Sequence, residues 1–234
     1  MAPLKISQCT IADGPALVAN NIPAFWADPN WVLAWRHRTL EYHISQVTLR
    51  FPRNLLNDRE TVRHQKAVDP ETGHILGYAR WCLPSSHKTS PDGTPAWPEA
   101  QVPAIEPEIE AEIRRLAGTA VWDPNEDDSV LGDRVTALKN EVTPKKSHIS
   151  LDYLAVHPDN QRKGVGTALV KSGIEQADRM GLDIFVHAFT EGYELYKRMG
   201  FELIAELIQD DSAYGGSGEY GAYFLIYHAT SRPT

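Results

Sequence analysis

The stretch from residue 151 to residue 201 most constrains how this 234-residue chain can fold. Leu151–Val156 and Leu182–Phe189 are apolar runs of strand length, and Pro158 ends the first of them. Between the two runs, apolar residues recur at three- and four-residue steps, which is the pattern of an amphipathic helix that Gly181 would cap. A strand, a helix and a strand in this order predict a right-handed parallel unit.

The turn before this helix, residues 161–167, has the sequence Gln-Arg-Lys-Gly-Val-Gly-Thr. Gly164 and Gly166 lack a Cβ atom, so the backbone can approach a ligand closely. Unpaired amides at a helix N-terminus carry the positive end of the helix dipole, and two basic residues add charge, so the turn predicts a phosphate site. It is neither a Walker loop nor a dinucleotide fingerprint, because the spacing differs and Leu169 replaces the third glycine. A surface turn before a core helix is the alternative.

Three motifs in this part of the chain occur together. They are a Gln/Arg-x-x-Gly-x-Gly/Ala turn, a preceding strand that ends Leu-x-Val-x-Pro, and a later Leu-Tyr-x-x-x-Gly-Phe segment. The matching residues are Gln161, Gly164 and Gly166; Leu154, Val156 and Pro158; and Leu195, Tyr196, Gly200 and Phe201. Together they resemble the GNAT superfamily of acetyl-CoA-dependent N-acetyltransferases, most closely over residues 148–209.

The resemblance implies a mixed α/β fold. A single twisted, mostly antiparallel sheet would contain the central parallel strand–helix–strand unit, with helices on both faces. We expect residues 1–234 to form one GNAT-like acetyltransferase domain with an insertion at residues 84–146.

Further strands and helices are predicted along the rest of the chain. The expected strands are Leu4–Thr10, Thr61–Val68, His74–Cys82, His148–Val156, Glu202–Ile208 and Glu219–Ala229. The expected helices are Ala12–Trp26, Asn30–Leu40, Ile44–Asn57, Glu106–Ala117 and Val130–Asn140. Pro23 should kink or end the first helix, and Pro52 should interrupt the third. Strict alternation in the central strand would put Leu151, Tyr153 and Ala155 on one face and Asp152 and its even-numbered neighbours on the other.

The insertion at residues 84–146 is rich in proline and includes an acidic loop at Asp123–Asp128. It is not simply disordered, because Trp97, Trp122 and two helical patterns have apolar surface to bury. Two interpretations stay open: a lid or pocket wall that shapes the choice of acceptor, and a packing embellishment away from the site.

Composition narrows the class of partner. The net charge of −8 argues against binding to nucleic acid or to anionic membranes. Cys9 and Cys82 have no motif spacing and fit free thiols in a reducing compartment, so we expect a cytoplasmic location. The N-terminus MAPLKISQCT lacks the apolar run of a signal peptide. A monomer and a homodimer both stay open.

The resemblance implies where acetyl-CoA binds as acetyl donor. Its pantetheine arm would pair with the backbone along the central strand, and the turn would hold its pyrophosphate. The expected binding residues are Leu154, Ala155, Val156, Gln161, Arg162, Lys163, Gly164, Val165, Gly166, Thr167, Thr190 and Tyr193. Phe189 stands where the family often has asparagine, which removes one cofactor contact.

Acetyl transfer to an amine needs two proton movements, because an alkylammonium is not nucleophilic and the departing thiolate must be protonated. Tyr196 matches the family tyrosine that serves as the acid, although a buried structural tyrosine is the alternative. Asp152 is the first candidate for the base, since a charge in an apolar strand is costly unless it is paired or functional. His148 and His187 are alternatives. Ser150 stands where some relatives have glutamate, which favours water-mediated deprotonation.

The expected activity is direct transfer of acetyl from acetyl-CoA to a primary amine of a small molecule or peptide, with no metal. The family often walls its acceptor pocket with the helices after the first strand, which would bring Phe25, Trp26, Trp31 or Trp35 near the substrate; core packing is the alternative for these rings. Two other functions remain open. One is a catalytically silent acyl-CoA-binding or regulatory domain, and the other is an acyltransferase with a different acyl donor or an O-acceptor.

Overall fold

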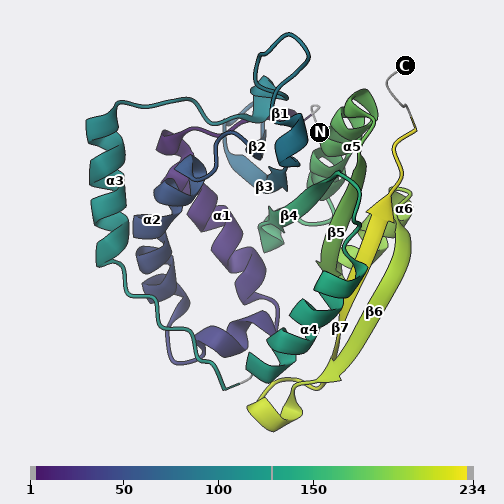
Figure 1. Cartoon of the computed structure of the whole chain (residues 1–234). Helices are drawn as coiled ribbons and strands as arrows, with labels where there is room; N and C mark the ends of the chain where they lie inside the picture. Colours follow the sequence, from purple (N-terminus) through teal and green to yellow (C-terminus); the bar gives the residue numbers. More distant parts are fainter. Residues whose placement is uncertain (1–3, 128, 231–234) are drawn as a thin grey trace.

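A single sheet organises the computed structural model, which describes residues 4–127 and 129–230 (Figure 1). Within these residues it has seven strands in the order β1-β2-β3-β4-β5-β7-β6. The strands are β1 (Lys5–Gln8), β2 (Val62–Val68), β3 (Ile75–Cys82), β4 (His148–Val156), β5 (Asp183–Phe189), β6 (Glu202–Asp210) and β7 (Glu219–Tyr227). Neighbouring strands are antiparallel except β4 and β5, which are parallel. The predicted mixed fold is confirmed.

Helices cover both faces of this sheet. The α-helices of the described residues are α1 (Gly14–Trp26), α2 (Leu40–Leu56), α3 (Pro107–Thr119), α4 (Ser129–Val142), α5 (Val165–Met180) and α6 (Thr190–Arg198). One buried cluster joins α5 and α6 to the sheet, and a second joins α1 and α2 to its other face. The predicted strand–helix–strand unit is therefore formed by β4, α5 and β5.

Close packing fixes α5 against the sheet. The Trp81 side chain on β3 is fully buried beneath the middle of this helix. A Cβ atom added to Gly173 would lie 2.0 Å from the Trp81 ring. Only glycine allows the helix to approach the indole this closely, so this residue sets the spacing between α5 and the sheet.

A β-bulge interrupts β4 at Asp152. Leu151 pairs with Trp81 and Tyr153 pairs with Arg80, so Asp152 has no opposite residue on β3. The extra residue shifts the alternation, and Leu151 packs in the α5 cluster whereas Tyr153 packs against the α1–α2 cluster. The prediction that Leu151, Tyr153 and Ala155 share one face is therefore wrong.

The two parallel strands pair over only a short length. Their register runs from His148 opposite Asp183 to Leu151 opposite Val186. Beyond the bulge, β4 continues to Val156 and β5 to Phe189 without pairing to each other. The sheet is thus open between the carboxyl ends of its two central strands.

The helices at the start of the chain differ from the prediction. Pro23 lies inside α1 and Pro52 inside α2, and neither helix ends at its proline. Both prolines lie near the C-terminal ends of their helices. Each removes one backbone hydrogen bond there without ending the helix. Asn30–Leu40 is not a helix, since it holds a short 3-10 helix, η2 (Trp31–Trp35), and the start of α2. Thr39 caps α2, its Oγ1 accepting from the Tyr42 amide at 3.2 Å.

Residues 84–146 contain α3 and α4, which confirms the two helices predicted there. Helix α3 packs against α2, and α4 lies across β6 and β7 (Figure 1). Gln209 on β6 donates a hydrogen bond from Nε2 to the Leu131 carbonyl at 3.1 Å. Residue 128 of the expected acidic loop lies outside the described residues. None of the described helices has the length and apolar character needed to cross a membrane.

Candidate active site

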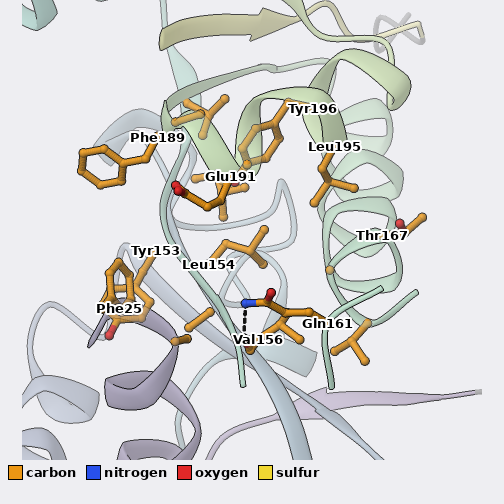
Figure 2. A pocket seen from close by; sticks show the side chains of 18 of the residues that line it. Phe25, Tyr153, Leu154, Val156, Gln161, Thr167, Phe189, Glu191, Leu195 and Tyr196 are labelled. Atoms are coloured by element: carbon orange, nitrogen blue, oxygen red, sulfur yellow. Dashed lines mark hydrogen bonds between the residues drawn. The ribbon is translucent and has the colours of Figure 1, made fainter. Parts of the chain in front are cut away.

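A cleft of about 570 Å³ opens where β4 and β5 separate (Figure 2). Its sides are the end of β4, the turn before α5, the first turn of α5, the end of β5 and α6. The remaining side comes from the end of α1 and is here called the α1 wall. This wall consists of Ala24, Phe25, Ala27 and Asp28. The cleft thus joins segments that are distant in the sequence.

The glycine turn forms one end of the cleft. Gly164 caps α5 in the left-handed conformation, with φ of +82°, and its carbonyl accepts the Ala168 amide at 2.9 Å. The amides of Val165, Gly166 and Thr167 precede this first intrahelical bond, and all three residues line the cleft. A Cβ atom on Gly164 would meet nothing within 4 Å, so there is open space in front of the turn. This arrangement suits a phosphate group.

Two other residues of the turn hold it to its neighbours. Gln161 donates from Nε2 to the Val156 carbonyl at 3.3 Å, which ties the turn to the end of β4 (Figure 2). A Cβ atom on Gly166 would lie 3.2 Å from Cδ2 of Leu195, so the first turn of α5 approaches α6 closely. Arg162 lines the cleft, whereas the Lys163 ammonium lies 3.4 Å from Oδ1 of Asn160, outside the lining.

Asn20 on α1 holds the end of β4, and the sequence analysis missed it. Its Nδ2 donates to the Ala155 carbonyl at 3.3 Å, and its Oδ1 accepts the His157 amide at 3.2 Å. The side chain is buried, and Nδ2 also donates to Oδ1 of Asn21 at 2.9 Å. Two asparagines on the apolar face of a helix are the signal that could have revealed this contact.

Tyr196 lies inside the cleft on α6. The residue is 4% exposed, and its ring packs edge-on against Phe201 at 5.4 Å between centroids. Gly192 allows this position, because a Cβ atom there would lie 3.1 Å from the Tyr196 ring. Burial raises the pKa of the Tyr196 phenol, so the hydroxyl keeps its proton at neutral pH. A proton donor requires this state.

Asp152 lines the same cleft as part of an ion pair. Its Oδ2 accepts from Nη2 of Arg80 at 2.5 Å and from Nε at 2.7 Å. The guanidinium carbon of Arg80 also lies 5.4 Å from the centre of the Tyr153 ring. The arginine compensates the charge that the sequence placed in an apolar strand.

The two histidine candidates lie in different places. His187 lines the cleft and stacks on Phe224, with 4.9 Å between ring centroids. Among the described residues its buried Nε2 has no hydrogen-bond partner. Burial, and secondarily Lys139, lowers the pKa of His187 to about 4, so the ring is neutral at pH 7. His148 lies at the other end of β4, outside the cleft lining, with Nδ1 2.9 Å from the Lys146 carbonyl.

Several residues of α6 differ in their relation to the cleft. Thr190 begins the helix and Tyr193 stacks on Tyr223 at 4.3 Å, and both lie outside the cleft lining. Glu191 and Arg198, which the sequence analysis did not single out, do line the cleft. An acidic residue in the first turn of a helix is common, so the sequence carries no signal for Glu191.

The cysteines match their expected chemistry. Cys9 is buried and Cys82 half-buried, and both are free thiols. Burial, followed by the charge of Asp152, raises the pKa of Cys82 to about 11. The thiol is therefore protonated at neutral pH and unsuited to act as a nucleophile.

Comparisons with known proteins agree with this fold. A sequence model described as an acetyltransferase (GNAT) domain matches residues 112–203. A crystal structure described as histone acetyltransferase HPA2 and related acetyltransferase, from Corynebacterium glutamicum, is similar at 20% identity over 99% of this chain and 98% of that one, with a TM-score of 0.58. A structure of an agmatine N-acetyltransferase mutant is similar at 17% identity over 96% of this chain and 99% of that one, with a TM-score of 0.51.

The GNAT acetyltransferase domain model thus matches residues 112–203, which contain the three motifs, and the whole chain has the fold of the similar structures. This match supports the predicted GNAT resemblance and an enzyme of the acyltransferase class.

Proposed function

We propose that this protein transfers the acetyl group of acetyl-CoA to a primary amine of a small molecule or peptide. The observation that carries this proposal is the cleft between β4 and β5. It has the glycine turn at one end, Tyr196 within it and the α1 wall at its side. A donor with a phosphate group and an extended arm fits the turn and the end of β4, which has no partner strand on its β5 side.

The donor would use the backbone more than side chains. The amides of Val165, Gly166 and Thr167 would hold the pyrophosphate, with Arg162 adding charge. The pantetheine arm would extend along Leu154–Val156. The Val156 carbonyl already accepts one hydrogen bond, from the flexible Gln161 side chain. This contact can yield to the donor at little cost.

The reaction is a direct attack without a covalent enzyme intermediate. The amine nitrogen bonds to the thioester carbonyl carbon, the carbon–sulfur bond breaks, and its electron pair leaves on sulfur. Tyr196 gives its proton to this thiolate and regains one from solvent. Starting from an ammonium, the products are the amide, CoA thiol and one released proton. Alignment of the amine with the thioester supplies much of the acceleration.

Deprotonation of the acceptor would run through water. Asp152 already accepts two hydrogen bonds from Arg80, and His187 has a pKa of about 4, so neither is a strong direct base for an ammonium. A water molecule between the amine and the Asp152 carboxylate would carry the proton away. Ser150, in place of a carboxylate on the same strand, supports this water-mediated route.

The test is release of CoA thiol from acetyl-CoA against alkylamines, arylalkylamines, amino acids and short peptides. Gly164→Glu places a carboxylate at the phosphate turn and should abolish acceptor-dependent release. Gly73→Glu is the matched control, because Gly73 has φ of +74° and open space around it, in the β2–β3 turn. Both variants introduce a similar backbone strain. A loss of CoA release in Gly164→Glu alone would therefore be due to the phosphate turn.

Three outcomes would contradict the proposal in different ways. Acetyl-CoA binding by calorimetry without release to any amine would favour another acceptor class or a silent binding domain. An equal loss of CoA release in both glycine variants would show that the turn has no specific role in binding the donor. Release that persists in Gly164→Glu would do the same.

A further inference from the structure

The segment between α3 and α4 crosses the end of the molecule where η2 lies (Figure 1). Residues 121–127 of this segment are here called the strap. Although most residues of the strap are exposed, five of the seven contact η2, α2 or the residues between them: Val121, Trp122, Asp123, Asn125 and Asp127. Such anchoring is unusual for a connection between two helices and calls for a physical reason.

Ion pairs fasten the strap to the residues that follow η2. Asp123 pairs with Arg38 through Nη2 and with His37 at 3.3 Å, and Asp127 pairs with Arg36 at 3.5 Å. Exposed ion pairs contribute little on their own. The Arg38 pair is different, because the Arg38 side chain is only 2% exposed.

Arg38 depends on the strap for its hydrogen bonds. Its Nη2 donates to Asp123 and to the Val121 carbonyl, both in the strap. Its Nε and Nη1 are buried and have no partner among the described residues. Loss of Asp123 would leave a buried guanidinium without a carboxylate, which is strongly destabilising to the local structure. The strap therefore holds this arginine, and the arginine holds the strap.

Backbone hydrogen bonds add to these pairs. The Asn125 amide donates to the Ala34 carbonyl in η2 at 2.8 Å. The Val121 amide donates to Oε1 of Gln46 on α2 at 2.9 Å. The strap thus follows the backbone of η2 as well as its side chains.

Trp122 connects the strap to the cleft through a row of aromatic rings. The distance between ring centroids is 4.6 Å from Trp122 to Trp35 and 6.1 Å from Trp35 to Trp31. It is 5.6 Å from Trp31 to Phe25, which belongs to the α1 wall. Phe25 then packs on Tyr153 of β4 at 4.7 Å. Each ring in the row contacts the next, from the strap to the floor of the cleft.

His43 lies at the centre of this aromatic group. It is fully buried, its ring lies 4.3 Å from Trp35, and neither ring nitrogen has a partner among the described residues. Burial, and secondarily Arg38, lowers the pKa of His43 to about 4, so the ring is uncharged at pH 7. Packing alone positions this imidazole, and Trp122 closes the group on its outer side.

We propose that the strap is a positioning element for the α1 wall. By holding η2 through Asp123 and Trp122, it fixes Phe25 and Asp28 at the cleft. The part of this inference that concerns substrate rests on the proposed function, since the α1 wall would contact the amine acceptor rather than acetyl-CoA. The strap would therefore govern acceptor binding without touching either substrate.

The primary test needs no substrate. Protein labelled with 5-fluorotryptophan gives one fluorine signal for each tryptophan, and the signals are assigned by single replacements. Trp122→Ala or Asp123→Ala should shift or broaden the signals of Trp26, Trp31 and Trp35. The signals of Trp81 and Trp97 should stay in place, because these two rings pack in the α5 cluster.

Controls separate positioning from general damage to the insertion. Glu112→Gln removes an ion pair with Arg115 on α3 and should leave all six tryptophan signals in place. Trp122→Phe keeps a ring against Trp35 and should restore the wild-type signals of Trp26 and Trp31. Phe25→Ala, at the cleft end of the row, should shift the Trp122 signal in return. Movement of Trp35 alone, with Trp26 and Trp31 unchanged, would overturn the proposal.

Kinetics test the link to the acceptor. With the amine of the panel that turns over, Trp122→Ala should raise the acceptor KM about fivefold and leave the acetyl-CoA KM within about twofold. An equal rise in both KM values would mean that the strap only stabilises the fold, and would refute the positioning role. If no amine turns over, the proposed function fails, while the fluorine signals still decide whether the strap positions the wall.

Discussion

Tyr196 and Asp152 share one cleft but have opposite surroundings. Apolar burial keeps the Tyr196 phenol protonated, whereas Arg80 compensates the charge of Asp152 at 2.5 Å. Different surroundings can thus give two side chains in one site different roles at the same pH, one as a proton donor and the other as a charged group. The cleft therefore brings together a protonated phenol on α6 and a paired carboxylate on β4.

Tyr196→Phe should lower kcat about 100-fold, because it removes only the proton that the leaving thiolate needs. The acetyl-CoA dissociation constant, measured by calorimetry, should stay the same. Tyr42→Phe, which changes an exposed tyrosine of α2, is the matched control. Unchanged turnover in Tyr196→Phe would assign this residue a structural role only.

At the scale of elements, the site depends on how β4 leaves the sheet. The bulge at Asp152 ends the pairing with β5, and Asn20 of α1 then holds Ala155 and His157 by their backbone. These two bonds hold the backbone where β4 leaves the sheet. Helix α1 thus supports the end of β4 and also supplies the α1 wall.

Asn20→Ala should destabilise the protein by about 1–3 kcal/mol, because it removes the hydrogen bonds of a buried side chain to the backbone of Ala155 and His157. It should also raise the acetyl-CoA KM, since the strand end along which the pantetheine arm would lie loses its anchor. Urea unfolding and steady-state kinetics measure the two effects. Asn54→Ala on α2 is the control, and an unchanged KM in Asn20→Ala would contradict the role assigned to the clamp.

The sequence predicted those elements whose residue pattern and capping residues lie within the element itself. The strand–turn–helix–strand order of residues 151–189 was predictable because periodicity and the glycines at 164 and 181 act within a few residues. The bulge at Asp152 was not, because register depends on the partner strand and not on β4 alone. The start of α2 was missed because the Thr39 cap was overlooked, and the predicted interruption at Pro52 was wrong because the helix continues past this proline.

The residues of the candidate site also fall into two groups, those within local motifs and those that only the fold brings together. Gly164 and Gly166 were singled out in one compact motif and Tyr196 in another, and all three line the cleft. Asn20 and the α1 wall come from a helix more than a hundred residues earlier, so only the folded chain brings them to β4. The motifs singled out the glycine turn and Tyr196, and the family resemblance named Phe25, which lies in the α1 wall, but neither indicated Asn20.

At the scale of the whole molecule, two buried histidines and one half-buried histidine lie in three different parts of the fold. His43 lies among the tryptophans, His64 contacts the Tyr78 hydroxyl at 2.7 Å, and His187 faces the cleft. Burial lowers the pKa of these rings to about 4, about 3 and about 4. All three are neutral in the folded protein at pH 7, and protonation must therefore oppose folding.

Acid should destabilise the protein between pH 6.5 and pH 4. In that window the unfolded chain binds protons at these histidines and the folded chain does not, so stability falls as the pH falls. The contribution is complete above pH 6.5. From pH 7.5 to pH 5, urea unfolding should show a loss on the order of 2 kcal/mol for each histidine.

His43→Phe should reduce this pH dependence, because it replaces one of the three rings with an aromatic side chain that cannot titrate. His74→Gln, at an exposed position next to β3, is the control and should leave the slope unchanged. A slope in His43→Phe equal to that of the wild type would show that His43 is not among the groups that couple folding to pH.

The short pairing between β4 and β5 also bears on how the molecule responds to force. Strand β1 lies at one edge of the sheet and β7 lies on the far side of this pairing, so a tensile load between them passes through it. Only the pairs from His148–Asp183 to Leu151–Val186 resist that load within the sheet. Helix α5 packs on β3 at Gly173 and also on β5. It therefore connects the two sides of this short pairing and supports it. The opening between β4 and β5 is thus also the place where we expect the sheet to separate first under load.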